Sequence, residues 1–192
     1  MTGVSRETTA RLARHLCLLG RWQTRINLVG AATRADPWRR HVLDSAQLAP
    51  LIPPGARLAD IGSGAGFPGL VLAIIRGGPV DLIESDARKA AFLTEAARAT
   101  EAPARVHNTR AEHLRLKADI VTARACAPLD RLLGLALPLL APGGICLFPK
   151  GTHVEKELEA ARARWRMTVR RHPSLSAPGS VLLELGSLAH VG

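Results

Sequence analysis

The residues best suited to bind a ligand lie in one glycine-rich segment. Asp60 is followed by Gly62, Gly64 and Gly66, with a single residue between successive glycines. A short run typical of a strand precedes this segment, and an apolar stretch typical of a helix follows it, which is the context of a nucleotide-binding loop. Because glycine has no Cβ atom, such a loop lets a ligand approach the backbone closely.

Two common nucleotide-binding patterns do not fit this loop. The fingerprint G-x-G-x-x-G would need glycine in place of Phe67, and no G-x-x-x-x-G-K-[ST] pattern is present. The loop instead resembles the first motif of the class I S-adenosyl-L-methionine-dependent methyltransferases. This resemblance implies that Asp60 orients the amino group of that cofactor, directly or through water. Glu84 is expected to accept hydrogen bonds from both ribose hydroxyls, as an acidic residue does in dinucleotide folds.

The surrounding pattern predicts an α/β fold. Strand-like runs occur at 57–61, 80–84, 105–107, 119–122, 145–148, 166–170 and 181–185, and helical stretches at 67–75, 87–100, 129–140 and 153–164. This alternation predicts a Rossmann-like, mostly parallel seven-stranded sheet with helices on both faces. Ligands bind beyond the carboxyl ends of such strands, where Gly62 and Glu84 fall.

An N-terminal helical extension is expected to precede this sheet. One amphipathic helix covers 12–26, and Asp36-Pro37 is expected to cap a second helix over 37–48. We therefore expect a short helical extension at 1–50 and a methyltransferase domain at 51–192, packed as one compact unit.

A series of motifs between Asn27 and Gly151 resembles the RsmG family, also called GidB. The most specific pieces are R-H-x-L-D-S at 40–45 and G-F-P-G at 66–69. The other pieces follow in the family's order: Asn27-Leu28, Leu82-Ile83-Glu84-Ser85, Arg88-Lys89, Phe92-Leu93, Arg110-Ala111-Glu112, Ala123-Arg124-Ala125 and Pro149-Lys150-Gly151. The resemblance implies methylation of guanine N7 in 16S ribosomal RNA, in the 530-loop region of the small subunit.

The resemblance also assigns site residues. The implied cofactor positions, together with those of the glycine loop, are Asp60, Gly62, Gly64, Gly66, Phe67, Glu84, Ala111, Glu112 and Arg124. The implied positions around the cofactor and the RNA are Asn27, His41, Arg110, Arg124 and Lys150. The chain departs from the family in having Val29 where threonine is usual, Glu84 where aspartate is commoner, and a shorter segment before Asn27.

The implied chemistry needs no general base. Guanine N7 carries a lone pair and no proton, so the enzyme only has to align it with the methyl group and exclude water. Arg124 is the candidate to hold the guanine or to close the cofactor pocket, although it could instead pair with a local acid. His41 and Asp44 could likewise form an ordinary surface pair, and Lys150 could be a solvated lysine.

Other functions stay open at this point. Methylation of cytosine C5 would need a nucleophilic cysteine, and Cys126 lies in the right region, although a lone thiol followed by Ala-Pro more often serves packing. Methylation of an exocyclic amine would need an Asn/Asp-Pro-Pro-aromatic motif, which 123–126 lacks. An inactive methyltransferase fold that only binds RNA is a third alternative.

The charge distribution favours a polyanionic partner. Of the net charge of +10, residues 1–40 carry +6 and residues 161–172 carry +5, so the rest of the chain is close to neutral. We therefore expect 16S ribosomal RNA, free or in the 30S subunit or an assembly intermediate, to be the partner. The second basic segment provides three candidate RNA-binding residues, Arg162, Arg164 and Arg166.

The remaining composition suggests a cytoplasmic protein without a metal. Cys17, Cys126 and Cys146 are far apart and form no Cys-x-x-Cys motif, so reduced thiols are expected and neither disulfides nor zinc. No signal peptide is expected. Pro138 and Pro142 interrupt the uncharged stretch 132–149, so no membrane span is expected. As a separate expectation, a monomer is favoured.

Overall fold

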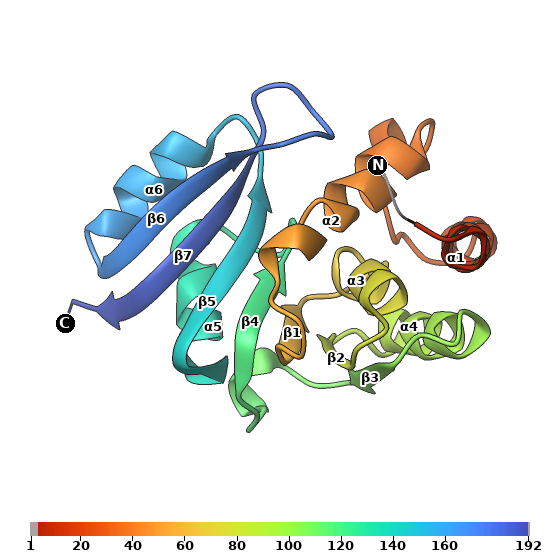
Figure 1. The fold of residues 1–192 in the computed structure, drawn as a ribbon, viewed down its shortest axis with the longest axis horizontal. Coiled ribbons are helices and arrows are strands. Elements are labelled where there is room, and N and C mark those ends of the chain that lie inside the picture. The colour runs from red at the N-terminus through yellow and green to blue at the C-terminus, as the bar shows by residue number, and fades with distance from the viewer. Residues whose placement is uncertain (1–3, 192) are drawn as a thin grey trace.

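The computed structural model describes residues 4–191, which form a seven-stranded sheet between two layers of helices (Figure 1). The strand order in space is β3-β2-β1-β4-β5-β7-β6. Five strands pair in parallel, and β7 runs antiparallel between β5 and β6. The strands are β1 (Leu58–Ile61), β2 (Val80–Ile83), β3 (Ala104–His107), β4 (Ala118–Ala123), β5 (Leu140–Lys150), β6 (Trp165–Pro173) and β7 (Val181–His190). The predicted mostly parallel α/β fold is confirmed.

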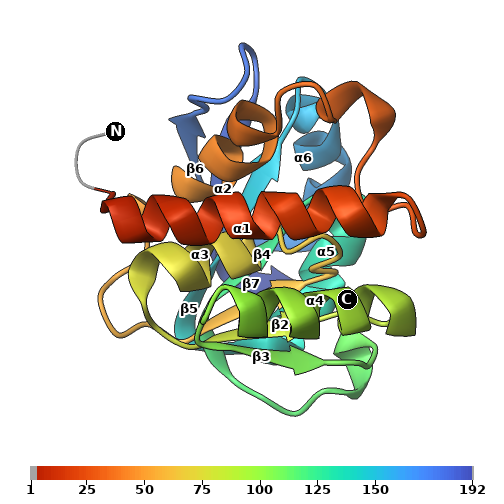
Figure 2. The ribbon, with the colours of Figure 1, turned by 90° about the vertical axis from the view of Figure 1, so that its right-hand side faces the viewer.

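The two faces of the sheet carry separate apolar cores. On one face, α3 (Gly69–Arg76) and α4 (Ala87–Ala99) pack on the strands, and α1 (Arg6–Gln23) lies against both helices (Figure 2). On the other face lie α5 (Leu129–Ala136) and α6 (Val154–Arg162). Successive strand residues point to opposite faces, so Leu82 joins the first core and Ile83 the second.

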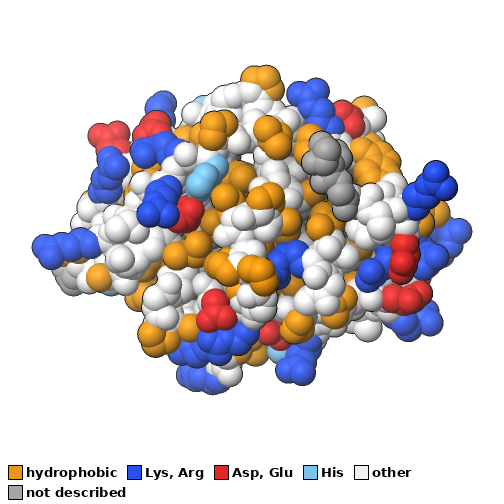
Figure 3. All heavy atoms as spheres, viewed as in Figure 1, with side chains coloured by type: hydrophobic (Ala, Val, Ile, Leu, Met, Phe, Trp, Pro, Cys, Tyr) orange, Lys and Arg blue, Asp and Glu red, His pale blue; other side chains and the backbone are white. Residues whose placement is uncertain are grey.

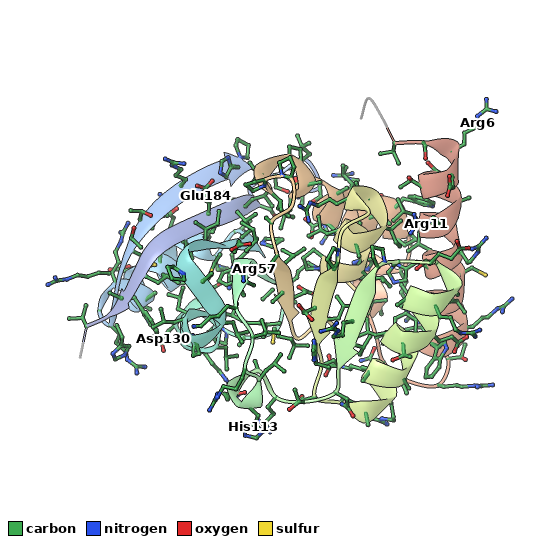
Figure 4. All side chains as sticks on the ribbon, turned by 60° about the horizontal axis from the view of Figure 1, so that its bottom comes forward. Arg6, Arg11, Arg57, His113, Asp130 and Glu184 are labelled. Atoms are coloured by element: carbon green, nitrogen blue, oxygen red, sulfur yellow. The ribbon has the colours of Figure 1, made fainter. Side chains whose placement is uncertain are left out.

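The first helix is attached to the end of α4 by two arginines. Arg11 donates to the carbonyl oxygens of Thr100 (2.6 Å) and Glu101 (2.7 Å), and Arg14 donates to that of Ala99 (2.8 Å). The last carbonyls of a helix lack intrahelical partners and carry partial negative charge, which makes guanidinium groups favourable there. In Figure 4, Arg6 extends away from the protein, whereas Arg11 lies on the same helix and donates to the end of α4. Part of the N-terminal positive charge therefore serves packing.

The segment between α1 and β1 is helical but irregular. It contains the short turns η1 (Ala31–Thr33) and η3 (Ala49–Leu51), a π-helical stretch η2 (Trp38–Leu43), and α2 (Asp44–Ala46). Asp36 caps this segment as predicted, because its Oδ1 accepts the N–H of Arg39 (3.1 Å). The expected regular helix over 37–48 is wrong in detail: the wider turns of η2 leave the Arg40 carbonyl oxygen bonded to Arg124.

Other predicted boundaries change for local reasons. The helix expected over 129–140 ends at Ala136, and a 3-10 turn (Leu137–Leu139) leads into β5, because Pro138 has no N–H to continue the helix. The helix expected over 67–75 starts at Gly69 and ends at Arg76. The N–H of Gly69 has no partner within the helix and donates to the side chain of Asp60.

The two basic flanks lie at opposite ends of the sheet. The first helix covers the β2–β3 side, whereas residues 161–172 follow α6 into the edge strand β6 (Figure 1). On the face in Figure 3, Lys and Arg side chains gather toward both ends and the lower border. Within residues 4–191 no helix is long and apolar enough to cross a membrane, and no three His, Cys, Asp or Glu side chains form a metal-binding group.

Candidate active site

The glycine loop between β1 and α3 has a backbone that side chains would disturb. Gly62, Gly64 and Gly66 all have positive φ angles, of 65°, 51° and 86°. A Cβ atom on Gly62 would collide with the thiol of Cys126, and one on Gly66 would lie 2.9 Å from Cβ of Leu70. Glycine is therefore required at both positions for conformational and steric reasons.

Asp60 holds this loop from inside the protein. Its side chain is fully buried, Oδ1 accepts the hydroxyl of Thr122 (2.8 Å), and Oδ2 accepts the N–H of Gly69 (3.2 Å). Burial raises the pKa of Asp60 to about 6, although these hydrogen bonds act in the opposite direction. Asp60 lines neither cavity described below, so its predicted contact with the cofactor stays a prediction, and its visible role is to fix the loop.

Glu84 connects the end of β2 to the same loop. Its Oε2 accepts the N–H of Gly64 (2.9 Å), and its Oε1 accepts the N–H of Asp86 (2.8 Å). The carboxylate is buried and lies at the carboxyl end of a parallel strand next to β1. This is the position from which an acidic side chain can reach the hydroxyls of a ribose.

The ring of Phe67 is enclosed by two histidines. The ring centroids of His15 and His41 lie 5.0 Å and 4.7 Å from that of Phe67, and the Arg124 guanidinium lies 5.0 Å from it. His15 Nε2 donates to the Ala65 carbonyl oxygen (2.8 Å). Burial lowers the pKa of both histidines to about 4, and for His41 the nearby positive charges act in the same direction.

Arg124 joins the end of β4 to the irregular segment before β1. One terminal nitrogen donates to the Arg40 carbonyl oxygen (3.0 Å) and to Oδ2 of Asp44 (3.2 Å), and the other donates to Nδ1 of His41 (2.9 Å). The alternative of pairing with a local acid is therefore observed. Arg124 also lines a cavity, so the ion pair and a role at the site coexist.

Two cavities lie along the carboxyl ends of the strands. The charged cavity, of about 630 Å³, is lined by three cations and two acids: Arg40, Arg124, Lys150, Asp44 and Glu157. The loop cavity, of about 100 Å³, is lined by Gly62, Arg110, Ala111 and Glu112 among others. Cys126 lines both cavities and therefore marks where they adjoin.

The connection between β6 and β7 forms part of the wall of the charged cavity. Ser176 donates its hydroxyl to Oδ1 of Asp44 (2.5 Å), and its carbonyl oxygen accepts from Nε of Arg39 (2.9 Å). Gln47 accepts the N–H of Leu175 (2.7 Å). The last hairpin of the fold is thus attached to the N-terminal segment, a contact that the linear sequence did not indicate.

The structure groups most of the predicted site residues and separates a few. Arg124 and Lys150 meet at the charged cavity, with His41 behind Arg124, and Gly62, Arg110, Ala111 and Glu112 meet at the loop cavity. Asn27 is exposed after the end of α1, where its Oδ1 accepts from Gln23 (3.2 Å), and it lines neither cavity. Its predicted role stays a prediction.

The predicted RNA-binding arginines lie far from both cavities. Arg162, Arg164 and Arg166 surround the turn between α6 and β6, at the amino end of β6. Lys150 and Pro173 both lie opposite Val181, so the carboxyl ends of β5 and β6 lie at the same end of the sheet, on either side of β7. The three arginines are therefore at the other end of the strands from the site, and Arg164 forms an ion pair with Asp130 (3.0 Å).

Four further residues at the site were not identified from the sequence. They are His15, Thr122, Glu157 and Ser176. His15 could have been found, because it shares the apolar helix face of Leu12 and Leu19, where a buried imidazole needs a partner. The contacts of Thr122 and Ser176 join distant segments, which spacing along the chain does not reveal, whereas Glu157 contacts Lys150 across the short turn between β5 and α6.

The groups along this edge fit S-adenosylmethionine. Positive-φ glycines expose the backbone, the Glu84 carboxylate suits a ribose, and Ala111 with Glu112 offers backbone and side-chain partners for a base. The larger cavity beside them leaves room for a second ligand.

Comparison with solved structures finds the same fold in proteins of low sequence identity. The M. jannaschii protein TYW2 in complex with AdoMet has a TM-score of 0.57 at 16% identity, covering 77% of this chain and 74% of that one. The fibrillarin/Nop5p complex has a TM-score of 0.57 at 13% identity, covering 75% and 81%. At these identities the likeness concerns the fold, that of class I methyltransferases.

Sequence comparison defines the family. A relative from Paramagnetospirillum magneticum named ribosomal RNA small subunit methyltransferase G is 59% identical, covering 96% of this chain and 91% of its own length. A relative of the same name from Gluconobacter oxydans is 50% identical and covers 100% of both chains. The family model for GidB, rRNA small subunit methyltransferase G, matches residues 8–180. The chain therefore belongs to the GidB family, which confirms the resemblance seen in its motifs.

Proposed function

We propose that this chain transfers the methyl group of S-adenosylmethionine to N7 of a guanine in 16S ribosomal RNA. The observation that carries this proposal is membership of the GidB family over residues 8–180. The site supports it, because Gly62 of the glycine loop lines the loop cavity, and Cys126 joins that cavity to one lined by three cations. Cations suit an RNA ligand, since phosphate contacts supply most of its binding free energy.

The cofactor supplies an electrophilic methyl group, and the residues of this chain bind and align the two ligands. The backbone of Gly62, which lines the loop cavity, and that of Gly64, which donates to Glu84, would hold the nucleoside part. Ala111 and Glu112 border the same cavity on the β3 side. Arg124 and Lys150, which line the charged cavity, would orient the nucleotide there. Alignment of this kind accounts for several powers of ten in rate.

The reaction at guanine N7 needs no general base, and the two histidines near the site are not suited to act as one. His15 and His41 are buried, their pKa values are lowered to about 4, and each engages one ring nitrogen with Ala65 or Arg124. Neither imidazole lines the charged cavity. Neither histidine is therefore offered as a base, and guanine N7, which carries no proton, requires none.

The cytosine-C5 alternative is disfavoured by the surroundings of Cys126. That reaction needs a thiolate. Desolvation of the thiol by its surroundings, together with the negative charges of Asp60 and Glu84, raises the pKa of Cys126. Its sulfur also lies against Gly62 at the loop. We therefore expect Cys126→Ala to keep most of the methyl-transfer activity, whereas loss of activity together with a trapped covalent RNA adduct would favour the cytosine reaction.

The direct test is transfer of a tritiated methyl group to 16S RNA and to 30S particles from a strain that lacks the modification. Mapping of the label should find a single 7-methylguanine in the 530-loop region. Label on another base, or on small molecules only, would contradict the proposal. Comparing free RNA, assembly intermediates and 30S particles identifies the form of RNA that is methylated, and sedimentation of the enzyme tests the proposed monomer.

A further inference from the structure

Lys150 and Glu157 form a donor–acceptor pair in the wall of the charged cavity. Lys150 is the last residue of β5, and its Nζ donates to Oε2 of Glu157 (2.7 Å). The Glu157 carboxylate is also fixed by α5, because the same Oε2 accepts the N–H of Leu129 (2.9 Å). Helix α6, strand β5 and the start of α5 thus hold these two groups side by side.

This pair retains hydrogen-bonding capacity toward the cavity. The ammonium group has three N–H donors, and Glu157 takes one of them. Both hydrogen bonds to Glu157 from residues 4–191 end on Oε2, so Oε1 is left for another donor. The Glu157 side chain is 29% exposed and lines the cavity.

Guanine has the complementary pattern on its Watson–Crick edge. Its O6 accepts and the neighbouring N1–H donates, so O6 can face Lys150 while N1–H faces Glu157. Adenine has the reverse pattern, with an amino donor beside an unprotonated N1, and would set two donors against each other and two acceptors against each other. Contact on this edge also leaves N7, on the other ring, without a hydrogen bond and free to react.

We propose that Glu157, together with Lys150, reads the O6 and N1–H groups of the target guanine and so determines which purine is methylated. This inference rests on the proposed guanine-N7 methylation and adds a specificity-determining residue to it. Asp44, the other carboxylate of the cavity, is less suited to this role. Its Oδ1 already accepts from Ser176 and Gln47, and its Oδ2 accepts from Arg124.

The test uses RNA with different bases at the methylated position, assembled into 30S particles if the particle is the substrate. Inosine keeps O6 and N1–H but lacks the 2-amino group, whereas 2-aminopurine keeps N7 but lacks both O6 and N1–H. We expect the wild-type enzyme to methylate inosine within about threefold of guanine, and 2-aminopurine at least about thirtyfold more slowly in kcat/KM. Rejection of inosine, or equal rates for guanine and 2-aminopurine, would overturn the proposal.

Glu157→Gln then tests the residue itself. The amide can still accept from Lys150 and can donate to N1 of 2-aminopurine, so the guanine to 2-aminopurine ratio should fall at least about tenfold. Glu159→Gln, an exposed change on the same helix, should leave the ratio unchanged. Equal loss of both rates in Glu157→Gln would assign it a merely structural role and overturn the inference. If wild-type enzyme methylates no guanine in any form of the RNA, the proposed function itself fails.

Discussion

The glycine loop and the charged cavity adjoin each other at the carboxyl ends of the strands, yet they are stabilised differently. In the loop, Asp60 and Phe67 are 0% and 3% exposed, and their contacts are short hydrogen bonds and stacked rings within the core. In the cavity, Lys150 and Glu157 form an ion pair that is partly open to solvent. The loop is therefore expected to be sensitive to size and burial, and the cavity to charge and donor geometry.

This difference separates two classes of substitution. Overpacking and loss of buried hydrogen bonds lower the free energy of unfolding. Solvent-exposed ion pairs contribute little to that free energy, whereas removing one partner of a largely buried pair such as those of this cavity changes both ligand binding and stability. Arg124 belongs to both regions, because it lies over Phe67 and pairs with Asp44 at the cavity.

The largest effect is expected for Arg124→Ala. The change removes the donor to Asp44, His41 and the Arg40 carbonyl oxygen at once, so methyl transfer should fall at least about a hundredfold. The free energy of unfolding should fall by about 1–3 kcal/mol, since a partly buried carboxylate loses its partner. Initial rates and urea unfolding measure the two effects.

Two further variants complete that test. Arg124→Lys keeps the charge without the planar fork and should retain intermediate activity. Arg105→Ala, an exposed change on β3, should alter neither quantity. Wild-type activity in Arg124→Ala would show that the site does not use this side chain.

Gly69→Ala tests the loop by size alone. The added Cβ would lie 2.5 Å from Leu82 and 2.6 Å from Asp60, so we expect a loss of about 1–3 kcal/mol in the free energy of unfolding. At this chain length that corresponds to a lower melting temperature by about 3–10 °C. Gly78→Ala, whose Cβ would meet nothing within 4 Å, is the matched control and should melt as the wild type does.

The pH dependence of stability should come from the loop region. The pKa of His15 is lowered from 6.5 to about 4, so the unfolded chain binds a proton at this residue more strongly than the folded one. Stability is therefore complete above pH 6.5 and is lost as the pH falls toward 4, by about 2 kcal/mol for His15 between pH 7 and 5. His41, with its pKa also lowered to about 4, acts in the same direction.

Asp60 changes the free energy of unfolding in the opposite direction as the pH falls. Its pKa is raised from 3.8 to about 6, so its ionisation lowers stability above pH 6 and the loss is recovered on acidification. With two histidines against one aspartate, the net change should still be a loss between pH 7 and 5. His15→Gln, which keeps a donor for the Ala65 carbonyl oxygen, should make urea unfolding less dependent on pH than in the wild type. An unchanged dependence would exclude His15 as a source.

Features encoded locally could be predicted from the sequence, and contacts between distant segments could not. The strand and helix pattern, the glycine loop and Glu84 are local features, because periodicity and turn residues encode them directly. At 37–48, where the prediction was wrong in detail, the helix takes part in a non-local contact: the backbone carbonyl oxygen of Arg40 accepts from Arg124, 84 residues further along the chain. The pairing of Asp44 with Ser176 was unpredictable for the same reason, since it joins segments that only the folded sheet brings together.

The basic flanks show where charge counting stops being informative. The count of arginines in 1–40 includes Arg11 and Arg14, which hold α1 on α4 and are partly used in packing. Arg40, in contrast, lines the charged cavity. Net charge therefore predicted a polyanionic partner, but only the fold distinguishes arginines near the site from arginines that serve structure.

The smallest effect is expected for replacing Arg162, Arg164 and Arg166 together by alanine. These side chains are exposed at the opposite end of the strands from the site, so the methyl-transfer rate at saturating RNA should not change. If they contact phosphates of a long RNA, the slope of log affinity against log salt concentration should fall by about 2, because Arg164 is already paired with Asp130. Arg40→Ala, at the cavity, should instead lower kcat/KM with a change of about 1 in the slope. An unchanged slope in the triple variant would confine RNA binding to the cavity side of the molecule.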